Sequence, residues 1–251
     1  MPSTTVEIRT PDGVADAYLS RPDDDQRHPG VLFLMDAYGL RPRIEEMADR
    51  IAARGYAVLA PNVFYRAGRT PVLPFPDMSD AEQRSAFFAQ VRPLMGALTP
   101  EAMASDGAAY LDELATVAGG PAGITGYCMG TRLAIRVAAA HPDRVAALGG
   151  FHGGGLVTDA PDSPHRQAGA LRAELYFGHA DNDGSNSPEQ IAALDAALEE
   201  AGVVHRAEVY EGAAHGYTMA DTPAWNEAAC ERHFAALFDL LERAVSPRGG
   251  G

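Results

Sequence analysis

The chain has 251 residues, of which 46% are hydrophobic and 22% charged, as is typical of a globular domain. Its formal net charge of −14 argues against nucleic acid and anionic membranes as partners, since both select basic surfaces. Two cysteines make no disulfide framework, and neither a signal-peptide pattern nor an apolar run of ~20 residues is present. We therefore expect a cytoplasmic protein with reduced thiols, a monomer or small homo-oligomer, which needs no cofactor.

The first part of the chain predicts a β-hairpin followed by buried strands. Residues 4–9 and 14–20 flank the turn sequence Pro-Asp-Gly. The continuous apolar runs 30–36 and 56–61 are typical of parallel strands that are covered on both faces. Apolar residues at helical spacing lie between these runs, and Gly55 should end that helix.

Two helices are expected next, after a loop that partly covers the site. The loop is segment 62–78. Residues 79–82, Ser-Asp-Ala-Glu, form a capping-box pattern at the start of the first helix, which Pro93 should kink or end. Thr99 and Pro100 should open the second helix as its N-cap and first residue.

The rest of the chain alternates strands with helices. Strands are expected at 122–127, 144–151, 172–178 and, nearer a sheet edge, 203–210. Helices should follow at Cys128, after the capping box 187–190 and from Thr222, and 246–251 should be a loose tail. This alternation predicts a single α/β domain, with a mainly parallel central sheet, helices on both faces and an N-terminal antiparallel hairpin.

The sequence Gly126-Tyr127-Cys128-Met129-Gly130 has the form Gly-x-nucleophile-x-Gly. In this motif the nucleophile lies on a sharp strand-to-helix turn where flanking side chains would collide. The helix N-terminus behind it favours a thiolate, and the N–H of Met129 can point at a developing oxyanion. The motif indicates that Cys128 is a nucleophile, whereas Cys230 is interpreted as a packed hydrophobe on the last helix.

A thiol at neutral pH needs a base, and the base needs an acid that orients it. In sheets of this kind the chain order is nucleophile, acid, histidine. Asp181 follows one strand directly and His215 follows the next, so both should lie where the carboxyl ends of parallel strands converge. We favour Asp181 as the acid, with Asp183 as its rival, because Asp181 comes first after the strand.

Two other patterns are given plain interpretations. The oxygen-rich sequence His-Ala-Asp-Asn-Asp at 179–183 lacks the spacing of an EF-hand, and no cluster has metal-ligand spacing, so no metal site is expected. Phe-His-Gly-Gly-Gly at 151–155 is similar to a lipase oxyanion loop but follows the nucleophile instead of preceding it. We interpret it as a glycine turn whose Phe151 or His152 lines the pocket.

From about Val6 to Leu241 the sequence resembles the dienelactone hydrolase family of α/β-hydrolases. "GYCMGTRLA", "GHADNDGSNSPEQ" and "AAHGY" stand in that family's order. The resemblance implies an α/β-hydrolase fold and a cysteine nucleophile. It also implies that an acid after the first long strand contacts the resting thiol: here this residue is Asp36, where the family usually has glutamate, and Ala37 would supply a second oxyanion N–H. Met219 stands where the family's lactone hydrolases have an arginine for the substrate carboxylate.

These features predict a hydrolase that cleaves a small ester or lactone through Cys128, His215 and Asp181, by way of a thioester acyl-enzyme. The alternatives are a thioesterase or acyltransferase that uses the same triad, and a ligand-binding homologue without turnover. The partner would be a small-molecule ester or lactone. The candidate pocket residues are Tyr38, Arg92, Phe151, His152 and Tyr217.

Overall fold

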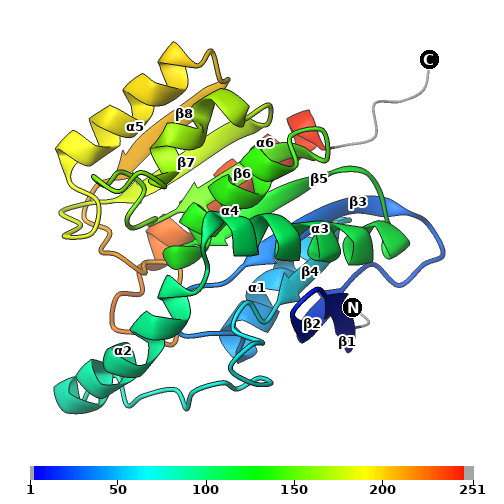
Figure 1. The fold of residues 1–251 in the computed structure, drawn as a ribbon, viewed down its shortest axis with the longest axis horizontal. Helices are drawn as coiled ribbons and strands as arrows, with labels where there is room; N and C mark the ends of the chain where they lie inside the picture. The colour runs from blue at the N-terminus through cyan, green and yellow to red at the C-terminus, as the bar shows by residue number, and fades with distance from the viewer. Residues whose placement is uncertain (1–2, 246–251) are drawn as a thin grey trace.

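An eight-stranded sheet runs through the computed structural model, which describes residues 3–245 (Figure 1). The strands occur in the order β1-β2-β4-β3-β5-β6-β7-β8, so the chain crosses over twice near the middle of the sheet. β1 and β2 are antiparallel, and the strands from β3 to β8 are mutually parallel. The strand bounds are β1 Ser3–Thr10, β2 Gly13–Ser20, β3 His28–Leu34, β4 Ala57–Pro61, β5 Ala118–Tyr127, β6 Val145–Phe151, β7 Glu174–Ala180 and β8 His205–Tyr210.

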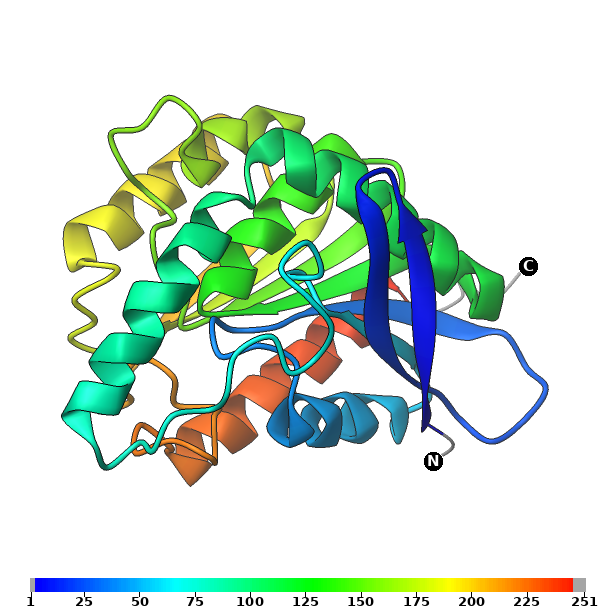
Figure 2. The same ribbon diagram turned by 60° about the horizontal axis from the view of Figure 1, so that its bottom comes forward.

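Helices cover both faces of this sheet. In Figure 2, α1 and α6 lie on one face and α3, α4 and α5 on the other, while α2 projects beyond the end of the sheet. The bounds are α1 Pro42–Ala52, α2 Ala81–Gly96, α3 Pro100–Val117, α4 Met129–Ala140, α5 Pro188–Glu200 and α6 Glu227–Ala244, with a short 3-10 helix at Pro164–Ala170. The prediction of a mainly parallel α/β fold with an N-terminal antiparallel hairpin is therefore confirmed.

The central strands are buried because helices shield both of their faces. Every residue from Val31 to Leu34 on β3 has no exposed surface, which explains why the sequence shows an apolar run there instead of an alternation. β8 lies at the end of the sheet and has a partly exposed pattern, as expected for an edge strand.

Several predicted helix starts are confirmed by their caps. Thr99 accepts a hydrogen bond from the N–H of Ala102, and Ser187 forms a reciprocal capping box with Gln190. Gly55 adopts φ 92° just after α1, a conformation that glycine reaches without strain.

Other boundaries differ from the prediction. The N-cap of α2 is Asp80 instead of Ser79, and the helix continues past Pro93 to Gly96. The last helix begins at Glu227 with Asn226 as its cap, not at Thr222, because the chain first makes a long irregular loop over residues 211–226. Residues 246–251, expected to be a loose tail, lie outside the described residues.

The parallel strands place their carboxyl ends at one edge of the sheet. The loops that leave β3, β5, β6, β7 and β8 all start there, and they carry every side chain that the sequence suggests for the nucleophile, acid and base. In residues 3–245, no helix combines the length and the apolar character that crossing a bilayer requires.

Candidate active site

Cys128 lies on the turn between β5 and α4 with a strained backbone. Its φ of 52° is in the left-handed region that side chains rarely adopt. The turn requires glycine on either side. A Cβ added at Gly126 would lie 2.4 Å from the carbonyl oxygen of Gly130, and one added at Gly130 would lie 2.1 Å from that of Leu34. The predicted strand-turn-helix geometry of the motif is therefore present, with the sulfur held at the start of a helix.

His215 joins this sulfur to a buried carboxylate. Its imidazole lines the same cavity as Cys128 and interacts electrostatically with the sulfur, and its Nδ1 lies 2.6 Å from Oδ2 of Asp183. The other carboxylate oxygen, Oδ1, accepts hydrogen bonds from the backbone N–H and the hydroxyl of Ser185 at 2.9 and 2.6 Å. The imidazole thus interacts with both the thiol and a fixed acid.

The prediction that Asp181 orients His215 is wrong. Oδ2 of Asp181 accepts a hydrogen bond from the backbone N–H of Gly212 at 3.0 Å, which fastens the start of loop 211–226 to the end of β7. Asp183 instead is only 8% exposed and turns toward the imidazole. Both aspartates occupy one turn after the strand, so the path of the turn, which the sequence does not reveal, decides between them.

The ionisation of His215 is set by its two partners. Burial opposes the imidazolium, but the interaction with the Cys128 sulfur and the hydrogen bond to Asp183 outweigh it and raise the pKa of His215 to about 10. Burial likewise opposes ionisation of Asp183, and its hydrogen bonds and charge interaction with His215 nevertheless lower its pKa. The surroundings therefore favour the imidazolium form of His215, paired with the Asp183 carboxylate.

Asp36 forms an ion pair with Arg41. Its Oδ1 and Oδ2 accept hydrogen bonds from Nη1 and Nη2 of Arg41 at 2.7 and 3.0 Å, and within residues 3–245 no hydrogen bond joins it to Cys128. Arg41 also pairs with Asp221, at 2.6 Å between Nε and Oδ2. The implied acid-thiol contact is therefore replaced by an ion pair on the adjacent loop.

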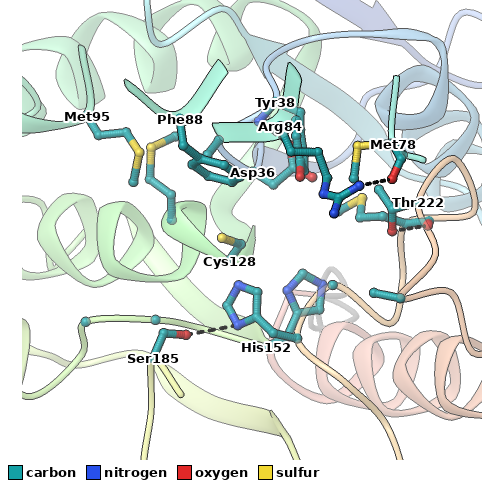
Figure 3. A pocket seen from close by; sticks show the side chains of 18 of the residues that line it. Asp36, Tyr38, Met78, Arg84, Phe88, Met95, Cys128, His152, Ser185 and Thr222 are labelled. Carbon is teal, nitrogen blue, oxygen red and sulfur yellow. Dashed lines mark hydrogen bonds between the residues drawn. The ribbon is translucent and has the colours of Figure 1, made fainter. Parts of the chain in front are cut away.

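Cys128 lines a cavity of about 700 Å³. Figure 3 shows its side chain among others that line this cavity. Asp36, Ala37 and Met129 line it, so the two backbone groups predicted to bind an oxyanion are next to the sulfur, although their role stays a prediction. Its other walls are mainly apolar. They come from α2, the segment before it and loop 211–226, and include Met78, Phe88, Met95, Met219, Thr222, Pro223 and Ala224.

Two of the five candidate pocket residues line this cavity. These are Tyr38 and His152, and the His152 ring lies edge-on to the ring of His215 at a centroid distance of 5.4 Å. Burial, followed by the nearby charges of His215 and His233, lowers the pKa of His152 well below its usual value, so this ring is neutral.

The other three candidates are wrong as pocket residues. Arg92 is exposed on α2. The ring of Phe151 packs in the core, 4.7 Å from that of His233, and the hydroxyl of Tyr217 donates to the carbonyl of Gly178 at 3.0 Å. Phe151 faces inward because of strand alternation, and Tyr217 because of how its loop packs. Neither direction can be predicted from the fact that a residue is close to a site residue in the sequence.

Two arginines that line the cavity were missed. Arg84 lies on the first turn of α2, where it donates to the carbonyl of Met78, and Arg132 lies four residues after the nucleophile on α4. The spacing from Cys128 to Arg132 puts both on one helix face, a signal that the sequence did contain. No Asp or Glu forms a salt bridge with either arginine in the described part of the chain.

The site has no evident metal ligands. Over residues 3–245, no three histidine, cysteine or acidic side chains come together in a way that could hold a metal ion. The chemistry available is that of a thiol, an imidazole, a carboxylate and backbone N–H groups.

Known proteins share this architecture. A Salmonella typhi protein named "Putative carboxymethylenebutenolidase" is 28% identical over 99% of this chain and 95% of its own length. The "Carboxymethylenebutenolidase" of Rhodococcus opacus is 27% identical over 83% of this chain and 78% of its own length. The crystal structure of a "Putative Dienelactone Hydrolase" from Klebsiella pneumoniae superposes with a TM-score of 0.84 at 20% identity, over 96% of this chain and 98% of that one.

The match to a protein family extends well beyond the residues of the site. The model of the dienelactone hydrolase family matches residues 15–245, which include the nucleophile turn, the acid turn and the histidine loop. The fold, the order of the three side chains and this match agree, and the chain belongs to the dienelactone hydrolase family of α/β-hydrolases.

Proposed function

We propose that this protein hydrolyses small carboxylic esters or lactones through a Cys128-His215-Asp183 triad and a thioester intermediate. The observation that carries the proposal is the arrangement of the strained Cys128 turn and His215 in the wall of one cavity of about 700 Å³, with His215 hydrogen bonded to the buried Asp183. A volume of this order suits a small-molecule substrate.

In the first half-reaction the Cys128 thiolate attacks the ester carbonyl. The oxyanion that forms is held by the N–H groups of Met129 and Ala37, each worth about 2.7–4 kcal/mol in comparable sites. The imidazolium of His215 gives its proton to the departing alkoxide as the C–O bond breaks. The products of this step are a thioester on Cys128, a free alcohol and a neutral imidazole.

The second half-reaction depends on a change in His215. The sulfur's negative charge raises the pKa of this histidine, and that charge disappears when the thioester forms. The pKa of His215 therefore falls in the acyl-enzyme, so the imidazole can take a proton from water. Hydroxide attack releases the acid and restores the thiolate-imidazolium pair, with Asp183 holding the ring throughout.

The cavity also suggests which substrates are preferred. Met219 occupies the position where the family's lactone hydrolases have a carboxylate-binding arginine, whereas Arg84 and Arg132 bring positive charge to the same cavity. The relatives' name refers to a lactone, and lactones are the substrate type that we expect here. A carboxylate on the substrate would meet the two arginines instead of residue 219.

The test is to trap the acyl-enzyme. Rapid quenching of the protein with 4-nitrophenyl acetate and with simple lactones, followed by mass spectrometry, should find one acyl group on the peptide that contains Cys128. Cys230→Ala should trap the same group and Cys128→Ser should not trap it as a thioester. Turnover without this adduct, or an adduct elsewhere, would sink the proposal.

The same experiment separates the alternatives. Adding an alcohol or thiol acceptor should leave water as the main acceptor for a hydrolase, while an acyltransferase would direct the acyl group to the acceptor. A ligand-binding homologue would bind lactones without forming an adduct.

A further inference from the structure

Loop 211–226 carries His215 but has no helix or strand of its own. It joins β8 to α6 through a series of turns. A loop of this length is uncommon unless it is functional, and its order must come from contacts with other elements. Catalysis by His215 nevertheless requires its position relative to Cys128 to be fixed, because an error of about 1 Å can cost about 100-fold in rate.

The loop is anchored to neighbouring elements at several points. Nη2 of Arg43 donates to the carbonyl of Thr218 at 2.7 Å, and Nε2 of His152 lies 2.8 Å from the Thr218 hydroxyl. These contacts, like that of Asp181 with Gly212, hold the loop to α1 and to the strand ends. None of them reaches the segment between β3 and α1 that carries Ala37.

Arg41 makes that missing connection. Its Nη1 and Nη2 donate to both oxygens of Asp36, and its Nε and Nη2 donate to Oδ2 and Oδ1 of Asp221 at 2.6 and 3.2 Å. Nη2 also lies 3.4 Å from the sulfur of Met219. Arg41 and Asp221 are 180 residues apart in the chain. Their ion pair therefore links the segment between β3 and α1 to loop 211–226.

The surroundings of Arg41 make this connection stiff. Its side chain is 8% exposed, and the rings of Tyr38 and Phe75 lie 5.4 and 5.3 Å from its guanidinium carbon. Each guanidinium nitrogen donates to a carboxylate oxygen, and Nη1 also donates to the carbonyl of Gly39 at 3.1 Å. A planar guanidinium with paired carboxylates has little freedom to rotate, unlike a lysine.

We propose that Asp36, Arg41 and Asp221 form a charged clasp that positions the His215 loop against the oxyanion-binding segment at Ala37. In this role Arg41 and Asp221 are positioning residues, which act on the reaction through His215 and Ala37. The same ion pair occupies both oxygens of Asp36, so the base for the thiol is His215 and not Asp36. This inference rests on the proposed function for its kinetic readout, and its second readout is independent of ester turnover.

The most direct test is Asp221→Ala. Asp221 is 29% exposed and its loss leaves Arg41 balanced by Asp36, so the variant should fold. We expect kcat for an ester to fall about 10-fold, with KM less affected. The variant should still fold, but the loop that carries His215 should no longer be held in its wild-type position. The rate at which iodoacetamide alkylates Cys128 at pH 7.5 should fall in parallel, because His215 is no longer held beside the sulfur.

The matched control is Glu231→Ala. It removes an ion pair between Arg50 on α1 and Glu231 on α6, which lies on the exposed surface away from the cavity. We expect unchanged kcat and unchanged alkylation of Cys128. Asp221→Glu, which keeps the carboxylate, should recover part of the lost activity.

Arg41→Gln alone would leave the buried Asp36 charge unpaired and risks unfolding. Arg41→Gln combined with Asp36→Asn removes both charges, and it should lower kcat and the alkylation rate at least as much as Asp221→Ala. If folded Asp221→Ala keeps both the wild-type kcat and the wild-type alkylation rate, the clasp has no positioning role. If the wild type hydrolyses no ester, the proposed function fails, and the alkylation rates alone still decide for or against the clasp.

Discussion

The two cysteines of the chain lie in regions that differ in backbone conformation, exposure and neighbouring groups. Cys128 is on a strained turn at the wall of the cavity that His215 also lines. Cys230 has no exposed surface and lies on the inner face of α6, where burial raises its pKa to about 11. Identical thiols therefore differ in access and in the groups that surround them.

The histidine beside each cysteine differs in the opposite sense. The pKa of His215 is raised to about 10, since the charge of Cys128 and the bond to Asp183 outweigh burial. His233, whose Nδ1 lies 2.5 Å from the carbonyl oxygen of Cys230, has no carboxylate partner within the described chain, and burial lowers its pKa to about 3. Ionic partners, and not burial alone, set the pKa of His215 apart from that of His233.

The largest expected effect comes from removing each sulfur in turn. Cys128→Ala should lower kcat for an ester by at least about 10⁴-fold, because it removes the proposed nucleophile. Cys230→Ala should keep near wild-type kcat and lose about 1 kcal/mol or more of unfolding free energy, since it leaves a small cavity in the core. Steady-state kinetics and urea denaturation measure the two effects. Equal activity losses would contradict the contrast between the cysteines.

The second-largest effect is expected from replacing Asp183, the acid that is paired with the histidine beside Cys128. The histidine beside Cys230 has no such acid in the described residues. Asp183→Asn should reduce kcat by about 10³–10⁴-fold, because the amide cannot stabilise the imidazolium and favours the wrong tautomer. The matched variant is Asp181→Asn, whose amide oxygen can still accept the hydrogen bond from Gly212. It should keep kcat within a few-fold of the wild type. The reverse ranking in kinetic assays would restore Asp181 as the acid.

A third prediction compares the thiols directly, without any substrate. At pH 7.5 iodoacetamide should modify Cys128 roughly 100-fold faster than Cys230, since the latter is both inaccessible and un-ionised. Peptide mass spectrometry over a time course gives the two rates, and Cys128→Ala is the control that identifies the labelled site. Similar rates in the folded protein would mean that Cys128 is not activated.

The smallest effect is on stability, and the two histidines give it opposite signs. The folded-state pKa of His233 lies below its ordinary value of 6.5. The folded protein therefore loses stability as pH falls from 6.5 toward about 3, because the unfolded chain binds the proton more readily. The raised pKa of His215 contributes stability that is fully present below pH 6.5 and is lost as pH rises through about 10. Each histidine contributes a slope of up to about 1.4 kcal/mol per pH unit in its window.

Urea denaturation at several pH values measures these slopes. His233→Gln should reduce the loss of stability between pH 6.5 and 4.5, and Cys128→Ala should reduce the loss at alkaline pH because His215 no longer has its anionic partner. An unchanged acid slope in His233→Gln would contradict the low pKa of His233.

Much of this architecture could be predicted from local patterns. The apolar run of β3, the glycines around Cys128 and the cap of α5 at Ser187 each act within a few residues, so the sequence reveals them directly. The start of α6 was misplaced because Thr222-Pro223 is also a valid helix start. The chain uses that pair in a turn instead, where the hydroxyl of Thr222 donates to the carbonyl of Met219.

The site itself was only partly predictable. The order of Cys128 and His215 follows from strand topology, whereas the choice of Asp183 over Asp181 depends on how one turn folds. Arg41 has no local signature of its role, because its partner Asp221 lies 180 residues away.

The sequence by itself determined the sheet, the turn that presents the sulfur and the chain order of the reactive groups, because period, glycine placement and caps operate over short distances. The tertiary structure decided which carboxylate meets His215, where Asp36 points and which arginines face the cavity. Those choices depend on contacts between loops from separate strands, and such contacts are defined only when the strand ends converge.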